Sequence, residues 1–293
     1  MKILILGSNG QLGRSISDIF PSYLNKFEYS KDQLSISDNE RLLETYKKID
    51  PDLVINCAAF TKVDLAEKEK KKALEINYEA VKNLAIISNK FKSTLIHFST
   101  DYVYDGEKET PYLESDEESP LNYYGLTKKY GDDIIIKTCK KYFIFRLSGV
   151  FSPYGENFVK SMLRLRHKKS IKVVNDQFLK PTSARMIANF LFENLEKKKF
   201  ETAPYGLYNF SLDGNPKSWN DFAKLIFVES ISLNLMEKTP KVSVTTSKEF
   251  DAQAIRPSYS VLDNSKIKQN FFFPQLNLKE VLQQDLPLIF STL

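Results

Sequence analysis

The first twenty residues constrain the fold more than any other part of the chain. An apolar run at positions 3–6 leads into three evenly spaced glycines, and apolar residues at 16, 19 and 20 follow with helical spacing. A buried strand that turns through glycines into a helix directs the N–H groups of that helix toward the turn, where a pyrophosphate can bind. The spacing is G-x-x-G-x-x-G and not the G-x-G-x-x-G of the usual fingerprint. We expect a dinucleotide to contact Gly7, Asn9, Gly10, Gln11, Leu12 and Gly13.

Strand and helix patterns alternate over the first half of the chain. Short apolar runs predict strands at 2–6, 26–29, 53–57, 94–99 and 142–147, and longer stretches predict helices at 11–20, 39–48, 67–91 and 124–139. This order predicts an α/β protein with a Rossmann-type, doubly wound parallel sheet. Ligands bind at the carboxyl ends of the strands in such sheets, where Gly7, Ala58, Ala59, Ser99 and Thr100 fall.

The pattern becomes irregular after Ser148. Prolines at 153, 181, 204, 216, 240, 257 and 274 separate short elements. A helical pattern at 185–195 and a strand at 207–210 predict that the chain returns once to the sheet. We therefore expect an NAD(P)-binding domain of residues 1–148, rejoined by about 183–213, and a smaller C-terminal substrate-binding lobe of residues 149–182 and 214–293.

Composition narrows the classes of protein. The chain has 293 residues, 42% of them hydrophobic, and a net charge of +5, but no apolar run approaches the ~20 residues of a membrane span. Lysines cluster at 68–72 and 197–199 among glutamates and apolar residues, which predicts solvated helix faces and no nucleic-acid surface. Two cysteines, Cys57 and Cys139, do not form a disulfide framework. We expect a cytoplasmic protein that binds neither nucleic acid nor membrane.

Tyr124 and Lys128 are four residues apart and share one face of a predicted helix. With Thr100 at the end of an upstream strand, this pair can move a proton to or from a carbonyl oxygen. The ammonium favours the phenolate and so lowers the pKa of a phenol from its ordinary value of ~10. Two more Tyr-x-x-x-Lys pairs, at 78/82 and 104/108, lack such an upstream partner. The alternative is an aromatic anchor beside a solvated lysine.

Several segments together carry a family resemblance. They are residues 7–13, 56–64 (NCAAFTKVD), 99–104 (STDYVY), 120–128 (PLNYYGLTK), 175–177, 181–182, 218–219, 256–257 and 262–263. In this order they resemble the extended short-chain dehydrogenases/reductases and, among these, the dTDP-4-dehydrorhamnose reductases. The resemblance implies that Thr100, Tyr124 and Lys128 are catalytic, with Tyr124 and Lys128 also at the cofactor. It further implies cofactor contacts from Ala58, Ala59, Phe60 and Thr61, and sugar contacts from Thr100, Asp101 and Tyr102.

Three positions differ from related enzymes. Tyr102 stands where sugar-nucleotide dehydratases have an acid, which disfavours dehydration. Gly149 stands where rhamnose-forming members usually have a tryptophan that packs on the sugar, so we expect a roomier sugar pocket at Gly149, with Phe151 or Tyr154 as replacements. Ser15 stands where some members have a glutamate that bridges a dimer through a metal, and we predict no metal.

The end of the second strand bears on the choice of cofactor. An acid there holds the ribose 2′-OH of NAD and repels a 2′-phosphate, whereas this chain has Ser30 and Lys31. We therefore expect both residues to bind the cofactor, and NADPH to serve at least as well as NADH.

The resemblance also suggests a reaction. It implies reduction of the C4 ketone of a nucleotide-linked 4-keto-6-deoxy sugar, above all dTDP-4-dehydro-L-rhamnose to dTDP-L-rhamnose, a precursor of cell-surface polysaccharide. Arg256 is expected to bind the diphosphate or to form a salt bridge that closes the lobes. Alternatives are a sister keto-sugar reductase, an epimerase, and an NADP-binding regulatory subunit similar to the β subunit of methionine adenosyltransferase. A homodimer is left open.

Overall fold

The first strand shows how the sequence produces the layered architecture. The computed structural model describes residues 1–250 and 252–293. In β1 (Lys2–Leu6), Ile3 and Ile5 pack into one core cluster, whereas Leu4 and Leu6 pack into another. All four side chains are fully buried because successive side chains of a strand point to opposite faces, and helices cover both faces here.

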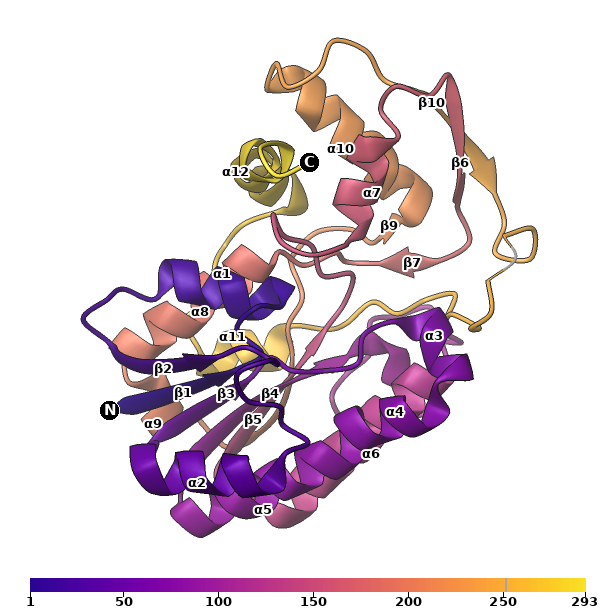
Figure 1. Ribbon diagram of the computed structural model, residues 1–293. Helices are drawn as coiled ribbons and strands as arrows, with labels where there is room; N and C mark the ends of the chain where they lie inside the picture. The colour runs from indigo at the N-terminus through magenta and orange to yellow at the C-terminus, as the bar shows by residue number, and fades with distance from the viewer. Residues whose placement is uncertain (251) are drawn as a thin grey trace.

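Six parallel strands form the central sheet in the order β2-β1-β3-β4-β5-β8 (Figure 1). The other five strands are β2 (Asn25–Tyr29), β3 (Leu53–Asn56), β4 (Thr94–Thr100), β5 (Tyr142–Leu147) and β8 (Gly206–Asn209). The chain moves outward from β1 to β2 and then crosses back to β3, so the strand order reverses between β1 and β3. A crevice at such a reversal is where open α/β sheets bind their ligands.

Helices cover the two faces of the sheet (Figure 1). One face packs against α1 (Gln11–Ile19) and α8 (Ala184–Glu196), followed by the short α9 (Lys199–Thr202), and the other packs against α2 (Asn39–Ile49), α5 (Ala80–Phe91) and α6 (Tyr123–Thr138). The predicted Rossmann-type fold is confirmed. Across the described residues, no helix combines the length and apolarity that a membrane crossing requires.

A second lobe stands above the carboxyl ends of the strands (Figure 1). It contains α7 (Phe158–Arg164), β6 (Ser170–Val174), β7 (Phe178–Leu179), β9 (Lys217–Ser218), α10 (Trp219–Ser232), β10 (Lys241–Thr245) and α12 (Leu278–Phe290). Helix α8 packs on one face of the sheet, and β8 pairs with β5 at its edge. The short α11 (Ser265–Asn270) also lies against it, because Lys266 Nζ donates to the Leu207 carbonyl at 2.7 Å.

The single helix predicted at 67–91 is wrong. The structure divides it into α3 (Val63–Lys68), α4 (Lys70–Leu74), a π-helical turn (Glu75–Glu79) and α5. The π turn presents Asn77, whose amide accepts from Phe60 N–H at 2.8 Å and donates to the Phe60 carbonyl and to Thr127 Oγ1. The irregular turn therefore holds the loop after β3 against α6, a use that π-bulges often have at functional sites.

Gly131 provides a test of this packing. A Cβ at position 131 would lie 2.5 Å from the Asn77 carbonyl oxygen, closer than real Cβ contacts come. We predict that Gly131→Ala lowers the free energy of unfolding by about 1–3 kcal/mol, although alanine is the better helix former. Urea denaturation would measure it, with exposed Lys137→Ala in the same helix as the control. A Gly131→Ala protein as stable as its parent would contradict this packing.

Candidate active site

The glycine-rich loop is shaped by two close backbone approaches. Gly7 has φ +78°, and a Cβ there would lie 2.7 Å from the backbone nitrogen of Ala58. A Cβ on Gly13 would overlap the Gly7 carbonyl oxygen. The loop is anchored to the neighbouring strand because Gly7 N–H donates to the Tyr29 carbonyl at 2.9 Å. These two glycines therefore let the loop fold tightly into a cradle in front of the first turn of α1.

Two connected hollows lie at the reversal of the strand order. The larger, about 610 Å³, runs from Gly10 past residues 56–63 to Thr100, Tyr124 and Lys128. The smaller, about 340 Å³, shares Gly10 and residues 57–59 with it and continues over the end of β2. Together they form one groove that joins the glycine loop to the Tyr–Lys pair.

Most of the residues predicted to bind the cofactor line this groove. The smaller hollow is lined by Gly7, Asn9, Gly10, Lys31, Ala58, Ala59, Phe60 and Thr61, and the larger also by Gln11 and Leu12. Two predicted residues do not line it: Gly13 packs under Gly7, and Ser30 is buried and bonds to Gln33. Residues 34–37, Lys62 and Lys72 line the smaller hollow and were missed, because no strand end or motif marks them.

The Asp101 carboxylate is buried at the lining of the larger hollow and accepts hydrogen bonds from three hydroxyl groups. Thr100 Oγ1 donates to it at 3.1 Å, and Ser148 and Ser260 each donate at 2.6 Å. Burial raises the pKa of Asp101 to about 6, and the three hydroxyl donors oppose that rise. The carboxylate thus connects β4, the end of β5 and the C-terminal lobe instead of projecting freely toward a sugar.

Helix α6 carries Tyr124 close to Thr100. Asn122 caps the helix by accepting from Gly125 N–H at 2.8 Å, and its amide donates to the Ile255 carbonyl of the second lobe. Only glycine fits at 125, since a Cβ there would overlap the Tyr102 carbonyl oxygen. Burial raises the pKa of the Tyr124 phenol above its ordinary value, and a hydrogen bond from Thr100 lowers it. The phenol is therefore protonated near neutral pH and can act as an acid.

The Lys128 ammonium is buried at the groove floor. Its Nζ donates to the Phe98 carbonyl at 2.7 Å and lies 3.0 Å from Nε2 of His97. Burial lowers the pKa of Lys128 to about 8, which the Asp132 carboxylate opposes. His97 therefore contacts a catalytic candidate. It also lies 3.1 Å from the Asn56 amide, a contact across β3 and β4 that no sequence spacing predicts.

Arg256 closes the two lobes together. Its guanidinium donates to both carboxylate oxygens of Asp64, at 3.2 and 2.6 Å, and its charge opposes the burial that raises the pKa of Tyr102. Tyr102 in turn packs edge-to-face on Tyr124, with ring centroids 6.1 Å apart. This placement realises the salt bridge considered from the sequence, beside the proposed substrate site.

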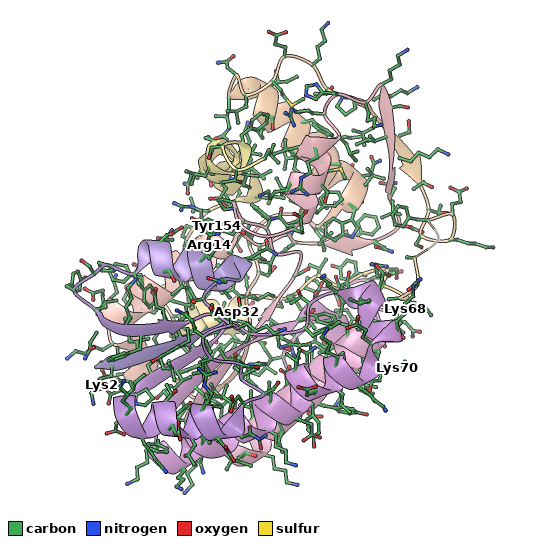
Figure 2. The ribbon with its side chains drawn as sticks, in the orientation of Figure 1. Lys2, Arg14, Asp32, Lys68, Lys70 and Tyr154 are labelled. Carbon is green, nitrogen blue, oxygen red and sulfur yellow. The ribbon has the colours of Figure 1, made fainter. Side chains whose placement is uncertain are left out.

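The expected roomier pocket at Gly149 stays a prediction. Gly149 lines the larger hollow with φ +52°, but a Cβ there would lie 2.6 Å from Leu179 Cδ1 and 3.5 Å from the Trp219 ring. Leu179 and Trp219 therefore border the hollow beside Gly149. Neither proposed replacement reaches it: Phe151 is fully buried, and Tyr154 hydrogen bonds to Asp18 and lies 4.2 Å from the Arg14 guanidinium (Figure 2).

A glycine-rich loop that faces a Thr–Tyr–Lys set across the end of a parallel sheet defines the class of short-chain dehydrogenases/reductases. Residues 1–287 match the family model described as the RmlD substrate binding domain. The chain belongs to the dTDP-4-dehydrorhamnose reductase family, which confirms the resemblance read from its motifs.

Individual relatives agree over nearly the whole chain. It is 38% identical to the dTDP-4-dehydrorhamnose reductase of Aggregatibacter actinomycetemcomitans, over 92% of this chain and 93% of that protein. A reductase structure from Clostridium acetobutylicum superposes with a TM-score of 0.90 at 34% identity, covering 99% of each chain. One from Bacillus anthracis, in complex with NADP, gives 0.89 at 33% identity over 98% of this chain and 99% of that one.

Asp101 generates a prediction about pH and stability. Its pKa is about 6 in the folded protein against an ordinary 3.8, so between these values the folded state binds more protons than the unfolded state. The free energy of unfolding must then fall as the pH rises from about 4 to 6, by on the order of 2 kcal/mol from this group.

Urea denaturation at pH 4.5 and 7 would measure the change. We expect the difference between the two pH values to shrink in Asp101→Asn and to persist in exposed Asp133→Asn. Buried Asp132, whose pKa is also raised to about 6, adds the same trend in both proteins. An undiminished difference in Asp101→Asn would contradict the assignment.

Proposed function

We propose that this protein reduces the C4 ketone of a nucleotide-linked 4-keto-6-deoxy sugar with NADPH. The favoured reaction converts dTDP-4-dehydro-L-rhamnose to dTDP-L-rhamnose. The observation that carries this proposal is the convergence of Thr100, Tyr124 and Lys128 with the glycine-loop cradle in one continuous groove. The names of the relatives support the choice of substrate.

The cradle fits a dinucleotide. Gly7 and Gly13 let the loop pack tightly on Ala58 and on itself, so that the N–H groups at the start of α1 can face a pyrophosphate. When bound, the nicotinamide supplies the hydride for the keto carbon. Lys31 at the adenosine end favours the additional phosphate of NADPH, while NADH remains usable.

Thr100, Tyr124 and Lys128 deliver the proton that the sugar oxygen takes up. Thr100 has one hydroxyl proton and two acceptors, the Asp101 carboxylate and the Tyr124 oxygen. While the Thr100 hydroxyl donates its hydrogen bond to Asp101, the Thr100 oxygen accepts a hydrogen bond from the Tyr124 hydroxyl. When Tyr124 gives its proton to the sugar oxygen, a rotation of the Thr100 hydroxyl stabilises the phenolate, and Lys128 favours the same charge. Lys128 would also hold the nicotinamide ribose.

Substrate contacts follow from the same groove. Tyr102 and Gly149 line it beside Thr100, and Asp101 supports Thr100 from behind. Arg256 retains guanidinium N–H donors after bonding to Asp64 and the Ala254 carbonyl, so it can still bind a diphosphate. We assign residues 1–148 and 183–213 to the cofactor and residues 149–182 and 214–293 to the sugar nucleotide.

The free thiols of Cys57 and Cys139 are consistent with a location in the reducing cytoplasm.

An assay with dTDP-4-dehydro-L-rhamnose, which is also called dTDP-4-keto-6-deoxy-L-mannose, tests the proposal. We expect NADPH oxidation by the parent protein and a rate about 10² to 10⁴ lower in Tyr124→Phe, because a positioned proton donor contributes that factor. NADPH affinity should be unchanged in Tyr124→Phe but reduced in Lys128→Met. Full turnover by folded Tyr124→Phe would refute the role of the phenol. If the parent protein does not turn over this substrate but reduces a UDP-linked keto sugar, it is a sister reductase with a different specificity. If it turns over neither substrate, it is a regulatory subunit.

The cofactor choice rests on Lys31. We predict that Lys31→Glu weakens NADPH binding at least tenfold while NADH binding changes little, because the new carboxylate repels a 2′-phosphate and accepts from a ribose hydroxyl. Titration of cofactor fluorescence measures both affinities. Lys92→Glu, at an exposed position beyond α5, is the charge-matched control. Equal losses of affinity for NADPH and NADH would show that Lys31 does not bind the 2′-phosphate.

A further inference from the structure

Trp219 is the only tryptophan in the chain, and it stands in the groove. It is the first residue of α10, and its place is fixed by its neighbour Ser218, which caps the helix at Asp221 N–H and donates to Asn175 Oδ1 at 2.8 Å. Ser218 also pairs with Phe178 in the small β7–β9 sheet. The indole is thus held by a hydrogen-bonded corner of the second lobe.

One side of the indole is packed and the rest is available. Its ring centroid lies 4.5 Å from that of Phe158 and 6.3 Å from that of Phe222 in the core of the second lobe. The side chain is nevertheless only half-buried, because its remaining surface lines the larger hollow. A large aromatic surface left at a groove wall, on a rigid support, is suited to contact a ligand.

Contacts connect the indole to the reacting end of the groove. Its Cη2 lies 3.5 Å from the position of a Cβ on Gly149. The preceding residue, Ser148, donates to Asp101 at 2.6 Å, and Asp101 accepts from Thr100. On the same side, Leu179 Cδ1 lies 2.6 Å from that Cβ position. Trp219 and Leu179 therefore line the groove beside Gly149, two residues after Leu147, which pairs with Thr100.

The groove is lined by two chemically different groups of side chains. Trp219, Leu179 and Val150 are apolar and are called the apolar wall here, whereas Thr100, Tyr102 and Tyr124 carry hydroxyl groups. A 6-deoxy hexose has the same division, because its C5–C6 methyl edge is apolar and its other ring positions bear oxygen. A sugar whose C4 oxygen meets Tyr124 can place its methyl edge on the apolar wall.

We propose that Trp219, together with Leu179, is the surface on which the C5–C6 methyl edge of the sugar packs. This surface selects 6-deoxy hexoses over hexoses that carry a hydroxyl group on C6. This inference rests on the proposed function. An apolar wall favours the methyl group because a hydroxymethyl group would lose water without gaining a partner. Discrimination between such close analogues in an apolar pocket reaches about 10²-fold at most.

The single tryptophan makes binding directly observable. With NADP⁺ bound, addition of dTDP-L-rhamnose should change the Trp219 emission, whereas dTDP alone, which lacks the sugar, should change it much less. Calorimetry should show that Trp219→Ala weakens dTDP-L-rhamnose binding at least tenfold and leaves dTDP binding within twofold. Trp219→Phe should recover part of the loss. Val228→Ala, at an exposed position of the same helix, is the control and should change neither affinity.

The outcomes separate this inference from the function beneath it. If the parent protein binds dTDP-L-rhamnose no more tightly than dTDP, the substrate assignment is overturned and the role of Trp219 with it. If the parent prefers dTDP-L-rhamnose but Trp219→Ala and Trp219→Phe keep that preference, only the role of Trp219 is overturned. Equal losses of dTDP and dTDP-L-rhamnose in Trp219→Phe would likewise show that the indole merely supports the lobe.

Discussion

The active site depends on one buried carboxylate. Asp101 is almost wholly removed from water and accepts hydrogen bonds from Thr100 on β4, Ser148 after β5 and Ser260 in the second lobe. A buried charge is tolerated only when it is well hydrogen bonded, so these three segments must be in place together. Because Thr100 is one of the three, the assembly of the lobes also sets the direction of the hydroxyl that acts on Tyr124.

A second buried ionic group holds α6 behind the site. Arg146 is completely buried on β5, donates to the Tyr104 hydroxyl at 2.6 Å and to Glu118, and lies 3.7 Å from Asp132. Asp132 is one turn beyond Lys128 and accepts from Ser99 at 2.5 Å. Removing one partner of such a cluster would leave an unpaired charge in the interior. The cluster therefore fixes α6 against β4 and β5, which keeps Lys128 on the groove floor.

The sequence predicted the elements whose structure depends on neighbouring residues. The apolar run of β1, the glycines and the helix after them could be read in sequence because each needs only its neighbours, as could α8 and β8. Contacts between distant segments could not be read. His97 meets Lys128 only because β4 and α6 pack together, and Trp219 reaches Gly149 only because β7 pairs with β9 some forty residues along the chain. The second-lobe helices α7, α10 and α12 were not predicted, because the sequence pattern after Ser148 is irregular.

Isotope transfer tests the central claim most directly. NADPH dideuterated at C4 of the nicotinamide is supplied with dTDP-4-keto-6-deoxy-L-mannose, and the product sugar is examined by NMR. If the groove delivers hydride to the keto carbon while Tyr124 supplies the proton, the product carries one deuterium, at C4 of the hexose. Deuterium at any other carbon, or a C4 hydrogen derived from water, would contradict the account and indicate a different reaction on the same fold.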